Sequence, residues 1–232
     1  MWDNPRQLNI LAGFLVGLVV LAVTLTGLQM ALRSPLWPVR DVTVQGELEH
    51  TLRSEIEAAL YNRVSGNFFS VDVEGVRAAL ERLPWVRRAA VRRVWPDRLE
   101  ATLEEHVALA RWGENALVNT HGERFAGASK QALPRFWGPR GTESEVARRY
   151  ARFDAIVAPL GSRVEEVILT PRLAWQLKLD NGVRLALGRD ADAAEVRLGS
   201  FVQSTAKGFV RYDYVDLRYP NGFALRTPEG RS

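Results

Sequence analysis

The sequence predicts an α+β protein with a single N-terminal transmembrane helix, a β-α-α-β-β domain, and a second antiparallel-sheet domain with helices on one face. Two observations lead to this prediction. The chain opens on a long apolar run without charges, and the remainder alternates between helical and strand periodicity, with proline and glycine at the boundaries.

Residues 8–32 predict the transmembrane helix. The run 10–28 is almost wholly apolar, and a bilayer core needs about 20 such residues. A cleaved secretory signal is the alternative, but its apolar region would span only about 7–15 residues and end in a small-x-small cleavage site. Trp2 and Trp37 flank the run, as interfacial aromatic residues do. We therefore expect an uncleaved anchor that leaves residues 1–7 on one side of the membrane.

Composition excludes several classes of function. The chain has no cysteine, so disulfides and thiolate chemistry cannot contribute. The net charge is +4 and the pI is about 9.7, yet the basic residues are scattered among acids and form no long run. This pattern is typical of a solvated surface, so we expect no nucleic-acid partner.

The first folded domain is predicted from local patterns. Asp72 is a candidate N-cap, Pro84 ends the helix that follows it, and Pro96-Asp97 favours a tight turn between two strands. The predicted elements are a strand at 39–45, helices at 53–61 and 73–82, and strands at 86–94 and 99–105.

The second domain shows the same two periodicities. Asn181-Gly182 is typical of a hairpin turn, because both residues tolerate positive φ. The predicted elements are helices at 143–160 and 191–206, a strand at 164–170, a hairpin at 175–187, and final strands at 212–219 and 223–226.

Two local phrases within the first domain resemble a known module. In the β-α-α-β-β order, Leu83-Pro84-Trp85-Val86 and the run 92–97 (RRVWPD) are similar to a POTRA domain. Placed directly after a single span, the module resembles the FtsQ/DivIB family. The implied parts are a cytoplasmic tail at 1–7, a transmembrane helix at 8–32, a POTRA domain at 38–107, a C-terminal β-rich FtsQ domain at 108–226 and a tail at 227–232.

The resemblance implies a non-catalytic divisome scaffold in the bacterial inner membrane. The N-terminus would be cytoplasmic, the bulk of the chain periplasmic, and the protein enriched at the septum. It would link early division proteins to septal peptidoglycan synthesis. The implied partners are FtsB and FtsL, with FtsK, FtsW and FtsI as further candidates. FtsK would contact the first strand, near Val42, and the surface arginines of the POTRA domain; a simple membrane-proximal spacer is the alternative.

The same resemblance locates a docking site in the C-terminal domain. The last strands of a chain often lie at a sheet edge, where backbone groups can accept a partner's strand. Arginine can grip a partner carboxylate with two bonds, although Pro220 removes one backbone donor. The alternative is that Tyr219, Phe223 and Leu225 only close the core of the domain. The expected partner-binding residues are Arg189, Arg218, Tyr219, Asn221, Gly222 and Phe223.

The sequence gives little support for two other functions. The histidines His50, His106 and His121 are too sparse for a metal site, and no nucleophile elbow, P-loop or dinucleotide glycine pattern is present. We therefore expect no enzyme activity, metal or cofactor. The remaining alternative is a POTRA-type chaperone or transport adaptor that binds extended polypeptide, but such proteins normally carry tandem modules.

Overall fold

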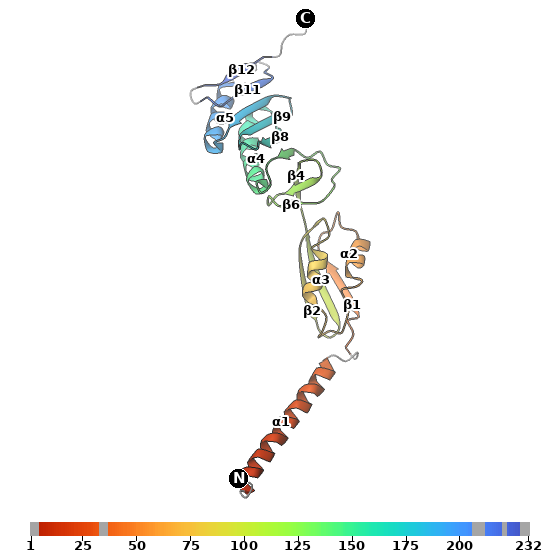
Figure 1. The fold of residues 1–232 in the computed structure, drawn as a ribbon. Helices are drawn as coiled ribbons and strands as arrows, with labels where there is room; N and C mark the ends of the chain where they lie inside the picture. Colours follow the sequence, from red (N-terminus) through yellow and green to blue (C-terminus); the bar gives the residue numbers. More distant parts are fainter. Residues whose placement is uncertain (1–4, 33–36, 206–211, 220–221, 228–232) are drawn as a thin grey trace. The chain divides into compact units, whose positions relative to one another are not determined.

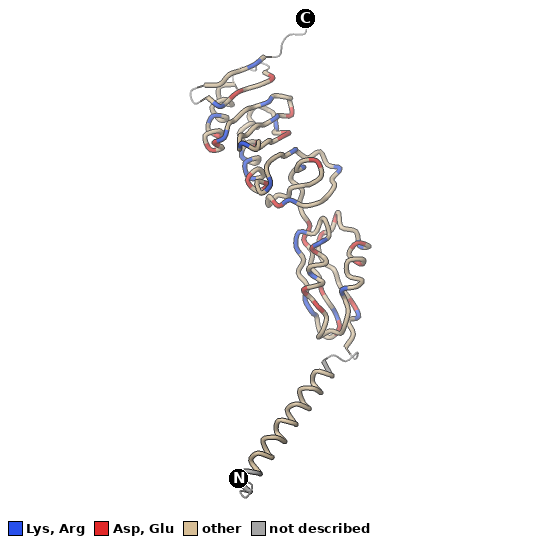
Figure 2. The backbone as a smooth tube through the Cα atoms, in the orientation of Figure 1, with Lys and Arg blue, Asp and Glu red and all other residues tan. Residues whose placement is uncertain are grey.

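The computed structural model describes residues 5–32, 37–205, 212–219 and 222–227, and the chain divides into two units at residue 105/106 (Figure 1). The first helix, α1 (Pro5–Leu32), contains one span, Asn9–Met30, that is long and apolar enough to cross a membrane. Its 22 residues rise about 33 Å, close to the hydrocarbon thickness of about 30 Å. Figure 2 shows this span without a charged residue.

The folded part of the first unit has the predicted β-α-α-β-β order. A three-stranded sheet has the order β1-β3-β2, in which β1 runs parallel and β2 antiparallel to β3. The elements are β1 (Asp41–Gln45), α2 (Arg53–Leu60), α3 (Val73–Leu80), β2 (Val86–Val94) and β3 (Arg98–Glu105).

The core of this module follows from helical and strand spacing. Asp72 Oδ1 accepts a hydrogen bond from the Gly75 amide at 2.9 Å, which caps α3 as the sequence predicted. One face of α3 and one of α2 then bury Leu80 and Ile56 against the sheet. Along β3 every second residue is buried, including Leu103, so the register of the central strand is fixed by burial.

The second unit is a nine-stranded sheet with two long helices. Its strand order is β12-β11-β10-β9-β8-β7-β4-β5-β6. The strands are β4 (Ala108–Trp112), β5 (Ala116–Asn119), β6 (Arg124–Phe125), β7 (Arg135–Trp137), β8 (Val164–Leu169), β9 (Trp175–Leu179), β10 (Arg184–Gly188), β11 (Tyr214–Asp216) and β12 (Ala224–Arg226); the helices are α4 (Glu143–Val157), the short 3₁₀ turn η1 (Ala158–Leu160) and α5 (Ala191–Thr205).

The sheet is mixed, whereas the sequence predicted an antiparallel one. β10–β11, β7–β8 and β4–β7 pair parallel. The reason is connectivity: parallel neighbours need a crossover, and α4 links β7 to β8 while α5 links β10 to β11. The two helices pack on each other, so they share one face of the sheet, as predicted.

The helix layer is held by a buried core and by one arginine. Phe136 of β7 and Phe153 of α4 are fully buried, and Phe153 meets Trp175 edge-on at 5.7 Å. Arg149 of α4 donates from Nη1 to Asp192 and to a second carboxylate of α5, both at 2.6 Å. The opposite face of the sheet has no covering helix among the described elements.

Glu105 organises the loop before α2. Its carboxylate accepts hydrogen bonds from the amides of Glu49, His50 and Thr51, the last at 2.7 Å. Burial raises the pKa of this carboxyl, but the hydrogen bonds from Thr51 and its neighbours outweigh burial and hold the pKa below its usual range. The loop therefore depends on an ionised Glu105.

Glu105→Gln is expected to destabilise the first unit by about 1–3 kcal/mol at neutral pH, because charged acceptors make the stronger bonds. A lowered folded-state pKa means that the stabilisation is complete above the unfolded pKa and is lost as pH falls through the folded value. Denaturant unfolding of the full chain in micelles measures the free energy of unfolding. The difference between the Glu105→Gln variant and the unmodified protein should shrink as the pH is lowered. Glu57→Gln, at an exposed surface pair, is the control; equal losses for both variants would contradict the prediction.

Candidate protein-docking site

The last described strand, β12, lies at the edge of the nine-stranded sheet. It pairs antiparallel with β11 only, and all three of its residues are exposed. An edge strand presents backbone amides and carbonyls that can bind another strand. The final strand is thus at an edge, as expected. The strand predicted at 212–219 is internal instead: it shortens to β11 and lies between β10 and β12, because the α5 crossover inserts it beside β10.

The ends of β10 and β11 meet beside this edge. Gly188 has a φ of 87°, and a Cβ built there would lie 3.5 Å from Cγ of Arg218. The segment around Gly188 and the segment around Arg218 are therefore in contact. Arg189, the next residue, is exposed and makes no hydrogen bond or ion pair among the described residues.

Arg218 forms an ion pair with Asp216. Its Nε donates to Asp216 Oδ1 at 2.8 Å, and Nη2 donates to Oδ2, so the guanidinium and carboxylate form a two-bond pair. The Arg218 bonds hold the pKa of Asp216 below its usual range, although burial opposes this. The carboxylate is 7% exposed and the guanidinium side chain 59% exposed. The sequence predicted that the Arg218 guanidinium would be open to a partner carboxylate, whereas the carboxylate of Asp216 in the same chain binds it.

The aromatic candidates are divided between core and surface. Phe223 is 40% exposed and meets the buried Phe201 edge-on at 5.3 Å, so it both packs and remains accessible. Tyr219 is 54% exposed. Gly222 is exposed, and Asn221 lies outside the described residues, as does Pro220.

Comparison with known proteins covers both units. The family model of the FtsQ-type POTRA domain matches residues 37–106, and that of the cell division protein FtsQ/DivIB, C-terminal, matches residues 110–218. The chain is 41% identical to the cell division protein FtsQ of Burkholderia pseudomallei over 97% of its own length and 94% of the relative. It is also 41% identical to that of Nitrosospira multiformis (97% and 99%) and 34% identical to that of Escherichia coli K12 (81% and 72%).

The chain belongs to the FtsQ/DivIB family of cell division proteins. The recognition from sequence is confirmed, and the single apolar N-terminal helix fits a single-pass membrane protein. The C-terminal FtsQ/DivIB family model includes Arg189 and ends at Arg218. Residues 219–226, which include β12, lie beyond the matched region, so their role is inferred from the structure and not from the family model.

Sequence reasoning missed the residues that hold the FtsQ/DivIB strand ends in place. Arg197 of α5 donates to the carbonyl of Leu217 at 2.5 Å and to that of Leu187 at 2.8 Å. No local pattern marks Arg197, because its acceptors belong to strands placed beside it by the fold. Asp216 could have been found, since residues two apart on a strand share a face and it lies two before Arg218.

The β12 edge also borders a groove on the open face of the sheet. This groove has a volume of about 500 Å³. Tyr214 lines it, and Arg226 of β12 places its guanidinium carbon 5.6 Å from the centre of that ring. Arg184 adds a further cation, while Lys178 pairs with Glu165 at 2.6 Å and the acidic Glu166 also lines the groove.

The POTRA unit has an edge of its own. β1 pairs with β3 only, and beside β1 a groove of about 790 Å³ runs along α2. Val42 and Val44 line it from the strand, and Leu60 and the 84% exposed Tyr61 line it from the helix region. This is where the sequence placed a contact for FtsK, which stays a prediction.

The candidate site exposes backbone, arginine and aromatic groups. Within the described ranges, no three or more His, Asp or Glu side chains are grouped to hold a metal ion. Two of the histidines stack on aromatic rings, His50 on Trp85 at 3.8 Å and His106 on Phe125 at 4.1 Å. These rings therefore contribute to packing.

Asp216→Asn is expected to release Arg218, because the amide cannot accept two charge-assisted bonds. The Nε–Hε signal of Arg218 in NMR spectra of the full chain should shift toward that of a solvated arginine, and the second unit should lose about 1–2 kcal/mol. Glu165→Gln, which removes the exposed ion pair with Lys178, is the control and should leave the Arg218 signal in place. An unmoved Arg218 signal in Asp216→Asn would show that the pair does not fix this side chain.

Proposed function

We propose that this FtsQ/DivIB family member is a non-catalytic scaffold of the bacterial divisome that docks FtsB, together with FtsL, at β12. The protein would be held in the inner membrane by α1, with its N-terminus in the cytoplasm and both folded units in the periplasm at the septum. The observation that carries the proposal is an exposed edge strand in a chain of this family, on a sheet that also presents Arg189, an exposed arginine with no ion pair among the described residues.

The docking mechanism is strand addition. A partner segment pairs with β12 through backbone bonds, which give affinity, and side chains beside the strand give selectivity. The accessible parts of Tyr219, Phe223 and Leu225, each between 39% and 54% exposed, supply apolar contact area. These residues suit an interface because they are already ordered by the domain.

Charge selects the partner segment. Arg226 lies on β12 itself, and Arg189 follows β10, two strands in from the edge. Arg184 adds a cation to the open groove, whereas Lys178 there is paired with Glu165. An acidic segment would be steered toward this surface and held in register. Arg218 serves a positioning role in this arrangement, because Asp216 fixes its fork and keeps the ends of β10 and β11 together.

The scaffold links early and late division proteins through separate units. In this proposal the β1 edge of the POTRA unit contacts FtsK, and the C-terminal unit carries FtsB and FtsL toward the septal peptidoglycan machinery, including FtsW and FtsI. Partners in one membrane meet at a raised effective concentration, so each contact can be weak by itself.

Leu225→Lys tests the edge strand. A charged side chain on β12 should weaken capture of the purified FtsB–FtsL complex by at least about tenfold, the equivalent of 1.4 kcal/mol. The measurement is a titration with the full chain in nanodiscs. Val196→Lys is the matched control, because Val196 is an exposed aliphatic residue on α5. Undiminished capture by Leu225→Lys would refute docking at β12.

Arg189→Glu tests the charge selection independently of the strand. Reversal of this uncommitted cation should lower the association rate and weaken binding of the same complex, with the loss reduced at high salt. Arg124→Glu on β6, at the other edge of the same sheet, carries the same charge change and should bind normally. If both reversals weaken capture equally, net charge and not a site at Arg189 explains the effect.

A further inference from the structure

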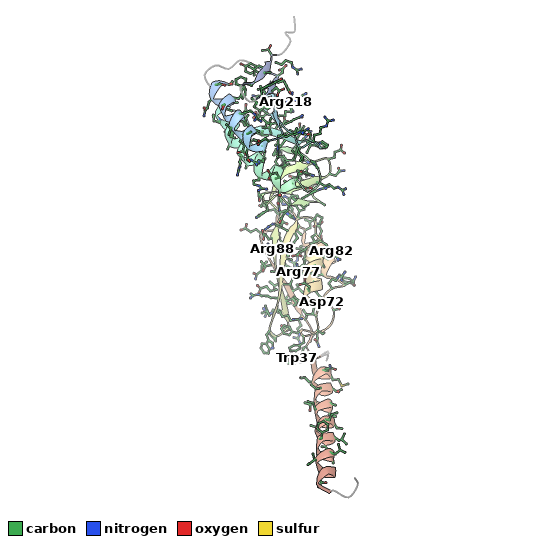
Figure 3. The ribbon with its side chains drawn as sticks, turned by 60° about the vertical axis from the view of Figure 1, so that its left-hand side comes forward. Trp37, Asp72, Arg77, Arg82, Arg88 and Arg218 are labelled. Carbon is green, nitrogen blue, oxygen red and sulfur yellow. The ribbon has the colours of Figure 1, made fainter. Side chains whose placement is uncertain are left out.

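One end of the POTRA unit carries a cluster of exposed aromatic rings that the proposed docking does not use. Trp37, Phe69 and Trp95 are 41%, 43% and 72% exposed. Trp37 and Phe69 meet edge-on with ring centres 6.1 Å apart. Figure 3 shows Trp37 at this end of the module.

Hydrogen bonds bring three separate segments together at this end. The Phe68 amide donates to the Trp37 carbonyl at 2.8 Å, which joins the start of the domain to the loop before α3. The Arg40 amide donates to the Asp97 carbonyl at 2.9 Å, which joins it to the β2–β3 turn that contains Trp95. The three rings therefore belong to one end of the sheet, where β1 begins.

None of these three rings is buried in the core. Phe68, next to Phe69, is 7% exposed, whereas Phe69 meets the Phe68 ring edge-on at 5.3 Å and remains 43% exposed. A tryptophan that is 72% exposed leaves most of its apolar area in water. Grouped exposed aromatics of this kind mark a contact surface, and tryptophan is enriched where proteins meet the headgroup layer of a membrane.

The length of chain between α1 and Trp37 limits which surface this cluster can contact. Five peptide steps separate Leu32, the last residue of α1, from Trp37. Each step spans at most about 3.6 Å, so Trp37 lies within about 18 Å of the end of the helix. The interfacial layer on each side of a bilayer is about 5–8 Å thick. This end of the unit consequently cannot move far from the membrane that α1 crosses.

We propose that the end formed by Trp37, Phe69 and Trp95 docks on the lipid headgroup layer of that membrane. The rings lie among the headgroups, and the exposed side chains of Arg40 and Arg98 face lipid phosphates, although Arg40 also lies 3.7 Å from the Asp97 carboxylate. The contact restrains the orientation of the POTRA unit on the bilayer. It rests on α1 spanning the membrane and is independent of docking at β12.

The absence of cysteine allows single spin labels to test this in the full chain. In nanodiscs of phosphatidylethanolamine and phosphatidylglycerol, a label at Trp95→Cys should lose accessibility to a water-soluble nickel chelate in power-saturation EPR. A label at Leu52→Cys, a position 63% exposed beside the opposite end of the sheet, should keep full accessibility. A label at Val20→Cys reports whether α1 is inserted. An inserted α1 with labels 95 and 52 equally accessible would overturn the proposal.

A second set of variants tests the role of the rings. Trp37→Ala with Phe69→Ala should restore aqueous accessibility to the label at residue 95. Tyr61→Ala removes an aromatic ring that is 84% exposed but belongs to the α2 groove, and it should leave the label shielded. Shielding that survives the double variant would overturn the assignment of the contact to this cluster.

Discussion

The parallel pairing of β11 with β10 determines where this protein can present an open strand. Parallel neighbours need a long connection, and α5 supplies it while burying its apolar side on the sheet. β12 then folds back on β11 and has no further strand of the described chain beside it. The exposed edge is thus a consequence of the crossover. Without β12, β11 would itself be the free strand.

Polar side chains at the proposed docking surface are already ordered by contacts within the domain. Arg197 binds two strand-end carbonyls, and Arg218 is fixed by Asp216. Groups that are already paired lose little conformational freedom on association, so less of the interaction free energy is spent on ordering them. Arg189 differs, because it remains uncommitted among the described residues and keeps its charge available.

Most elements were predictable because their signals are local. Asp72 and the spacing of Val76 and Leu80 define α3, and the alternation around Leu103 defines β3. The order of strands in the sheet could not be predicted, since the pairing of β4 with β7 or of β10 with β11 depends on contacts far apart in sequence. For the candidate site, family resemblance supplied Arg189 and Arg218, but the Asp216 pair and the inner position of β11 required the fold.

The short length of β12 limits what strand addition can contribute. Three residues offer few backbone bonds, each worth about 0.5–1.5 kcal/mol net. Several such bonds give only about millimolar affinity by themselves. A shared membrane supplies effective concentrations of that order, so anchoring by α1 and a modest edge contact can together hold a complex. A membrane-docked POTRA unit would strengthen this effect, because a module restrained on the bilayer searches a smaller volume than an unrestrained one.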